Sequence, residues 1–398
     1  MTATAAHAAA PLPRGWPGTL QLGLADGPGG AAALRASAPF GLRYQYLAGG
    51  VNTGQGWATW NPGGAFASGY VRESHAHRLL PVLTYYMLRQ SLPGRDVGDE
   101  LRADLGNLAD RATMRAYFAD LWLLLRRIGQ THRRAVVHVE PDLWGYGEQA
   151  ARGDDAATVP AAVASTGYRS LRGLPDTLAG FARAVARLRN RLAPRAWLAW
   201  HLSAWGTKVD LALNDPPRRQ TIRLARRAAR FYRSLHARFD LTFTDIADRD
   251  AGFREKVDGA GRAYWWSGGD FARERRFLRT FSRAARQRVA IWQIPLGNTV
   301  MRAMDDTWGH YQDNRVQWLL GKRSWPHLRA LRRAGVVALL FGPGADGTTC
   351  ACDARRDGAT NPVPIDGNHR RSLSADDDGG LFRSLARAYY RRGALRVR

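Results

Sequence analysis

The sequence contains very little cysteine. Only two of its 398 residues are cysteines, Cys350 and Cys352, so a disulfide framework does not stabilise this chain. One intervening residue makes an ordinary disulfide difficult, and we interpret the pair as two unpaired thiols. They would need further ligands to hold a metal, and no metal-binding spacing such as HExxH occurs. No metal and no cofactor are therefore expected.

Lysine is also scarce, because arginine supplies almost all of the positive charge. Lys208, Lys256 and Lys322 are the only lysines among 59 basic residues, and the formal net charge is +25. Many arginines fall in helical stretches, which predicts a solvated, basic exterior. The same charge alternatively indicates attraction to an acidic polymer. No helix-turn-helix, zinc-finger or RNA-recognition motif occurs, so specific nucleic-acid binding is a weak alternative.

Long apolar runs are missing as well. No stretch approaches the roughly 18 uninterrupted apolar residues of a membrane span, so none is expected. Residues 1–15 are alanine-rich but lack a basic region and a long apolar core, so we expect no signal peptide. The expected location is the cytoplasm, or outside the cell if an export signal lies beyond this sequence. Residues 1–17 are expected to form a flexible segment, and nothing indicates the oligomeric state.

Eight short strand-like runs recur along the chain, with helical stretches between them. The hydrophobic content of 45% is ample for a large core. The expected strands are Leu20–Ala25, Leu42–Leu47, Leu80–Tyr85, Ala135–Glu140, Trp197–Leu202, Leu241–Asp245, Val289–Ile294 and Val336–Phe341. The expected helices include Met114–Ile128, Leu178–Leu192, Pro216–Phe239, Phe271–Gln287, Trp325–Ala334 and Leu381–Tyr390.

This alternation predicts an α/β protein with a parallel sheet. The count of eight favours a (β/α)8 TIM barrel with long βα loops, forming one domain over residues 1–398. The alternative is an open, doubly wound sheet, whose strands are buried on both faces and almost wholly apolar. Here polar residues interrupt the strands, as His138, His201 and Gln293 do, which favours the barrel.

The most informative stretch runs from Val136 to Tyr146 and reads VVHVEPDLWGY. Side chains alternate across a strand, so His138 and Glu140 share one face. If the valines face the helices, Glu140 points into the barrel mouth, where active sites of this fold lie. Glu140 is therefore the expected proton donor, because burial there would raise its pKa. The alternative is a structural pair between Glu140 and Arg43.

Cleavage of a glycosidic bond usually needs a second carboxyl group. Asp245 ends the sixth expected strand and ranks first, with Asp142 and Asp248 close behind. Weaker candidates are Asp26, Asp305 and Asp306. Separations of about 5–5.5 Å and about 6.5–9.5 Å distinguish retention from inversion, and sequence does not supply that distance.

Aromatic residues gather in the expected loops after the strands. Fourteen tryptophans are many for this length, and aromatic faces stack on sugar rings. His201 and Gln293 lie on strands beside them and can bond sugar hydroxyls. The expected substrate-binding residues are Trp57, Trp60, Tyr86, Trp144, His201, Trp205, Gln293 and Trp308. Single loop tryptophans are often core residues, and His201 is alternatively a satisfied core histidine.

Glu140-Pro-Asp142, after a hydrophobic strand, is similar to the Glu-Pro-Asp strand-end motif of family 6 cellulases. It also resembles the Asn-Glu-Pro end of strand four in clan A glycosidases, where the glutamate is the acid/base. The resemblance implies a TIM-barrel glycoside hydrolase of an outlying family, with that role at Glu140. Val139 stands where clan A has asparagine, and Gln293 where it has the nucleophilic glutamate. The nucleophile is therefore not carried over.

The sequence thus predicts a glycosidase acting on a poly- or oligosaccharide. Its basic surface favours an acidic glycan. One alternative is a carbohydrate-binding barrel without catalysis. Another is a lyase or phosphate-ester enzyme that uses the glycine-rich segment 342–347 and the arginines. A polymer-binding protein that uses its positive surface is the last alternative.

Overall fold

The computed structural model of the chain describes residues 10–300, 311–344 and 381–397. Within these residues eight parallel strands pair in chain order, and β8 pairs with β1, so the sheet closes into a barrel. The strands are β1 (Gln21–Ala25), β2 (Leu42–Leu47), β3 (Leu80–Tyr85), β4 (Val136–Val139), β5 (Trp197–His201), β6 (Leu241–Asp245), β7 (Val289–Pro295) and β8 (Val336–Gly342). The predicted (β/α)8 barrel is confirmed.

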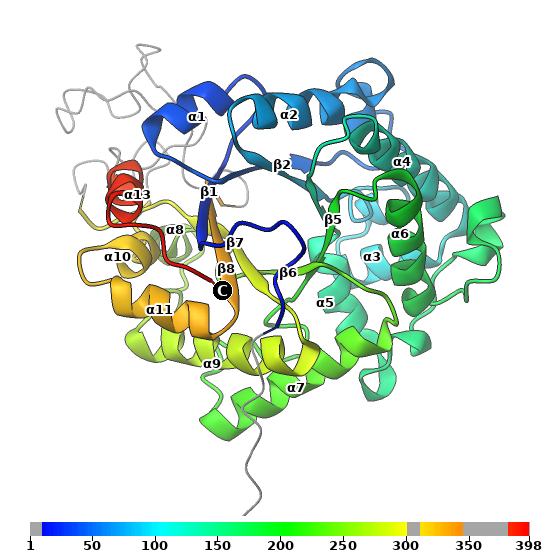
Figure 1. Cartoon of the computed structure of the whole chain (residues 1–398). Coiled ribbons are helices and arrows are strands. Elements are labelled where there is room, and N and C mark those ends of the chain that lie inside the picture. Colours follow the sequence, from blue (N-terminus) through cyan, green and yellow to red (C-terminus); the bar gives the residue numbers. More distant parts are fainter. Residues whose placement is uncertain (1–9, 301–310, 345–380, 398) are drawn as a thin grey trace, which may run out of the picture.

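Helices surround the strands as an outer ring (Figure 1). They are α1 (Ala31–Ser37), α2 (Ala65–Ala76), α3 (Glu100–Ala109), α4 (Arg111–Gly129), α5 (Pro141–Ala150), α6 (Leu178–Leu192), α7 (Arg218–Ser234), α8 (Ala251–Lys256), α9 (Gly268–Ala285), α10 (Arg315–Leu320), α11 (Trp325–Arg333) and α13 (Leu381–Arg391). Among the described residues, no helix is long and apolar enough to cross a membrane.

Helix starts follow local chemistry that the sequence carries. The Thr177 hydroxyl accepts a hydrogen bond from the Gly180 N–H at the start of α6. At α9, Ser267 and Asp270 form a reciprocal capping box. Such caps satisfy backbone N–H groups that the helix itself leaves without partners, and each stabilises its helix by about 1 kcal/mol.

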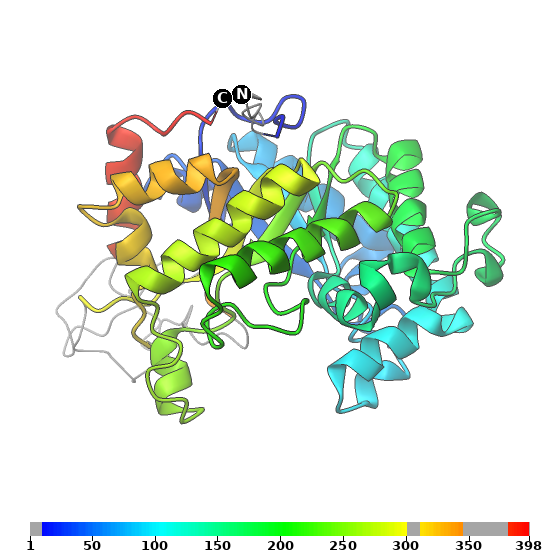
Figure 2. The same ribbon diagram turned by 90° about the horizontal axis from the view of Figure 1, so that it is seen from below.

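The two ends of the barrel differ. Thr19 forms an antiparallel bridge with Arg396, so the first and last described segments lie together at one end. Figure 2 shows α3, in cyan, and α8, in yellow-green, projecting at the opposite end. Helix α3 lies in the connection that leaves β3, and α8 follows β6, so this is the end where active sites of this fold lie.

Strand β2 shows how alternation divides the barrel. Tyr44 and Tyr46 face inward, and both contact Trp292 on β7, which is not adjacent to β2 in the sheet. Arg43 faces outward, toward α2. An inner aromatic layer and an outer helix-facing layer are therefore built from one run of residues.

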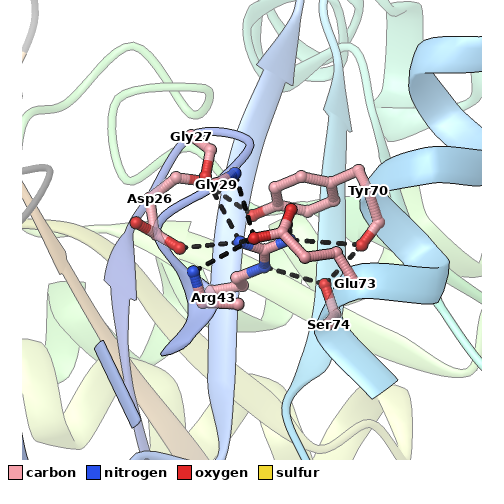
Figure 3. Close-up of polar contacts among 8 residues, drawn as sticks. Asp26, Gly27, Gly29, Arg43, Tyr70, Glu73 and Ser74 are labelled. Carbon is pink, nitrogen blue, oxygen red and sulfur yellow. Dashed lines mark hydrogen bonds and ion pairs between the residues drawn. The ribbon is translucent and has the colours of Figure 1, made fainter. Parts of the chain in front are cut away.

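Arg43 is fully buried. Figure 3 shows its polar contacts with Asp26 and with residues of α2. Its guanidinium lies 2.8 Å from Asp26 Oδ2 and 2.9 Å from Glu73 Oε2, and its Nε donates to Ser74. A buried guanidinium needs this complete set of acceptors, because leaving its charge unpaired is strongly destabilising. The alternative pairing of Glu140 with Arg43 is therefore wrong, and Asp26 has a structural role here.

Candidate active site

A cavity of about 620 Å³ opens at the end of the barrel where the strands lead into α3, α5 and α8. Three of the four expected catalytic residues line it: Asp142, Asp245 and Asp248. Four of the expected substrate-binding residues line it as well: Tyr86, His201, Trp205 and Gln293. Sequence reasoning therefore located this end of the barrel, although not every residue in it.

Asp142 enters the cavity from the first turn of α5. Pro141 starts this helix, as its fixed φ and missing N–H allow. Burial raises the pKa of Asp142 to about 6, although a hydrogen bond from Tyr86 and the neighbouring His201 act in the opposite direction. A carboxyl group with this pKa is about half protonated at pH 6 and about one-tenth protonated at pH 7.

Asp245 ends β6, and its side chain faces the barrel interior. Its Oδ1 lies 3.1 Å from His201 Nε2. His201 Nδ1 lies 3.1 Å from His138 Nε2, and His138 Nδ1 lies 3.3 Å from the Thr84 hydroxyl. A chain of polar groups therefore runs from inside the barrel to a carboxylate in the cavity, and it fixes the orientation of that carboxylate.

Asp248 is engaged differently. It forms ion pairs with Arg249 and with Arg254, which also binds Asp258. Both arginines contact Oδ2, and a carboxylate beside two guanidinium groups has its charge compensated. Asp248 thus helps to organise the loop between β6 and α8.

Glu140 does not point into the cavity as the strand parity predicted. β4 ends at Val139, and Glu140 adopts a left-handed backbone (φ 43°, ψ 74°), which interrupts the alternation. Its side chain is buried, and its carboxyl oxygens accept hydrogen bonds from the N–H groups of Met87 and Leu88. Burial raises its pKa to about 8. Glu140 therefore secures the segment after β3, which carries Tyr86.

Aromatic side chains form much of the cavity wall. Trp205 lies against Tyr146, with ring centroids 4.9 Å apart, and Tyr146 donates a hydrogen bond to Glu100. Across the barrel, the ring centroids of Trp292 and Tyr46 are 5.4 Å apart, and both residues line the cavity. These rigid faces suit the apolar faces of sugar rings.

Three of the expected aromatic ligands lie elsewhere. Trp57 is fully buried and donates to Asp120 through its indole N–H at 2.7 Å. Trp144 is also fully buried, because it belongs to α5 rather than to a loop, and it bonds the Val139 carbonyl. Trp60 is 42% exposed but packs on Phe66 outside the cavity wall. Trp308, Asp305, Asp306, Cys350 and Cys352 lie outside the described residues.

The cavity also contains acidic residues that sequence reasoning missed. They are Glu100 on α3, Asp210 in the segment after β5, and Glu274 on α9. Glu274 lies among Arg273, Arg275 and Arg276, in a run that has the composition of a solvated helix face. Nothing local in the sequence marks it, because its position depends on how α9 packs against the barrel.

No protein-family model matches the sequence, and no curated protein sequence matches it. Among solved structures, a family 26 endo-β-1,4-mannanase from Cellulomonas fimi has 10% identity over 94% of this chain and 70% of that chain, with a TM-score of 0.49. A psychrophilic family 10 endo-β-1,4-xylanase has 10% identity over 92% and 96% of the two chains, with a TM-score of 0.44. These neighbours are glycoside hydrolases. Function resides in site residues rather than in a fold, and no role is transferred from them.

Proposed function

We propose that the protein is a glycoside hydrolase. The observation that supports this most strongly is the pair Asp142 and Asp245, which line one aromatic cavity in different electrostatic surroundings. Burial raises the pKa of Asp142 to about 6, whereas Asp245 is bound to His201. A carboxyl group with a raised pKa suits the proton donor, and a second carboxylate in the same cavity supplies the other group that glycosidic cleavage requires.

Asp142 is assigned the role of proton donor to the oxygen of the leaving sugar. Asp245 supplies the second carboxylate, which either attacks the anomeric carbon or activates water. Its contact with His201 keeps it oriented toward the cavity. The stereochemistry of the first-formed product distinguishes these two routes.

The walls of the cavity support a sugar ligand. Trp205, Tyr46 and Trp292 offer ring faces, and Gln293 offers an amide from a backbone with positive φ at the end of β7. Such positive-φ positions cluster at functional sites. Stacking and hydrogen bonding together are the usual means of carbohydrate recognition.

The test is reducing-sugar release from neutral, acidic and amino-sugar polysaccharides by the wild type, Asp142→Asn and Asp245→Asn. We expect release from at least one polymer, and a loss of at least about 10³-fold in each variant. Glu148→Gln is the control, because Glu148 is a buried acid that does not line the cavity. Circular dichroism checks the fold of each variant.

Release that survives both aspartate substitutions would refute the assignment of the pair. Binding to a polymer without release from any would instead indicate a carbohydrate-binding barrel that does not catalyse.

A further inference from the structure

The cavity has a charge opposite to that of the whole chain. Its walls contain six carboxyl side chains, namely Glu100, Asp142, Asp210, Asp245, Asp248 and Glu274. Among the residues that the structure describes, two arginines line it, Arg249 and Arg254, and both form ion pairs with Asp248. The whole chain has a formal charge of +25, whereas acids outnumber bases in this wall. The cavity therefore favours a positively charged ligand, although the exterior attracts negatively charged ones.

Glu274 has a buried carboxyl oxygen without a hydrogen-bond partner among the described residues. Its side chain comes from α9, is only 5% exposed, and lines the cavity. Its Oε1 makes no hydrogen bond within the described residues. The adjacent Arg273 is engaged by Asp215 at 2.8 Å and by Asp270 at 2.7 Å. A buried polar group without a partner is costly, which points to a ligand that supplies the missing contact.

The electrostatic surroundings of Glu274 indicate the charge of that ligand. Burial, with Asp245 and Asp210 adding to it, raises the pKa of Glu274 to about 8. A cation placed among these three acids would stabilise the ionised form of Glu274 and satisfy its free oxygen. An organic ammonium group carries this charge and can donate a hydrogen bond to that oxygen.

We propose that the cavity recognises a hexosamine unit with a free amino group, and that the ammonium binds Glu274 beside Asp245 and Asp210. This inference rests on the proposed sugar-cleaving function and specifies its substrate class. An ammonium carries three donors, which suits acceptors from several directions. An N-acetyl group carries no charge, and a uronate would repel the acids.

The experiment separates binding from cleavage. Ligand-detected NMR at pH 7 compares the affinities of glucosamine and galactosamine with those of their N-acetyl forms and of glucuronic acid. We expect the free amines to bind the wild type at least tenfold more tightly than the N-acetyl forms. Glu274→Gln should reduce that ratio below threefold.

Glu148→Gln is a matched control. Glu148 is also buried, also has an Oε1 without a partner, and has a pKa raised to about 8, but it lies outside the cavity wall. This variant should keep the wild-type ratio. If Glu274→Gln fails to fold, Asp210→Asn replaces it and should lower the ratio at least twofold.

A wild-type preference for N-acetyl sugars or for glucuronic acid would overturn the inference. A preference for amines that persists in Glu274→Gln would do so too, as would the absence of binding by every sugar. Because these readouts need no hydrolysis, a preference for amines with no polymer cleaved would refute only the hydrolase assignment. Cleavage of neutral polymers without that preference would refute only the amine site.

Discussion

His201 Nε2 lies 3.1 Å from Asp245 Oδ1, and this contact joins the interior of the barrel to its cavity. The histidine comes from β5 and the aspartate from the adjacent β6, so the pairing of two strands sets the geometry. Asp245 is consequently held by a side chain that is itself buried and bonded to His138. A carboxylate supported in this way keeps its orientation before any substrate arrives.

The same contact fixes where the protons lie in the chain of polar groups. If Asp245 is ionised, His201 Nε2 donates to it, and His201 Nδ1 accepts from His138 Nε2. His138 Nδ1 then accepts from the hydroxyl of Thr84. Each ring nitrogen then has one partner. Burial, together with His201, lowers the pKa of His138 well below its ordinary value, which agrees with this assignment.

The first prediction concerns stability in acid. Above pH 6.5 His138 is neutral in both the folded and the unfolded chain, so its contribution is constant. Below that pH only the unfolded chain takes up the proton, because the pKa of His138 is lowered by folding, and stability falls. His138→Gln should therefore lose less stability than the wild type between pH 7.5 and pH 4.5, as measured by urea unfolding.

While folded His138 stays neutral, that difference grows by about 1.4 kcal/mol for each pH unit below the unfolded pKa of 6.5. His75→Gln is the control, since His75 is only half-buried and binds the Arg134 carbonyl outside the barrel interior. Equal slopes for His138→Gln and the wild type would mean that His138 does not carry the acid sensitivity.

The second prediction concerns the pH dependence of cleavage. If Asp142 donates the proton, the enzyme is active while this group is protonated. Because burial raises its pKa to about 6, kcat/KM should fall tenfold per pH unit above about pH 6. Tyr86→Phe removes a hydrogen bond that lowers this pKa, so the fall should begin at higher pH. A fall that does not move in Tyr86→Phe would argue for another donor.

The third prediction separates Glu140 from Asp142. Glu140 holds the N–H groups of Met87 and Leu88, and Gln in its place retains only one acceptor oxygen. We expect Glu140→Gln to lower kcat/KM about 10–100-fold by loosening the segment that carries Tyr86. The pH at which activity falls should not change. A loss as deep as that of Asp142→Asn, in a variant that retains its fold, would return the donor role to Glu140.

The barrel could be predicted because each strand and helix has its own local sequence pattern, and these patterns recur along the chain. β2, β3 and β6 have the predicted bounds, and the other strands differ by one residue at one end or at each end. Helix α6 also has its predicted bounds, between Thr177 as N-cap and Pro194. Short apolar runs, caps and breakers specify each element without reference to the rest of the chain.

The site was only partly predictable, because its geometry depends on single backbone conformations and on how separate helices and strands pack together. Strand parity correctly set His138 facing inward, but one left-handed residue turned Glu140 away. Trp144 was expected in a loop, yet α5 begins at once after β4 and buries it. Glu274 reaches the cavity from a helix, and no strand-end pattern could have revealed it.

The last prediction concerns stability at alkaline pH. Glu148 on α5 is buried, and its Oε1 has no partner in the described part of the chain. Burial, with Asp154 adding to it, raises its pKa from 4.5 to about 8. Below pH 4.5 the group is protonated whether or not the chain is folded. As pH rises toward 8 the unfolded chain releases the proton and the folded chain retains it, so stability declines.

Glu148→Gln removes that decline, because glutamine fills the same space and does not titrate. We expect the variant to be about 2–4 kcal/mol more stable than the wild type at pH 8.5 and equal to it near pH 4. Urea unfolding across this range measures the difference. Glu73→Gln should behave oppositely and be destabilising at neutral pH, because Glu73 is bound to Arg43 and its pKa is lowered. A constant offset between Glu148→Gln and the wild type at all pH values would show that packing, rather than proton release, sets its effect.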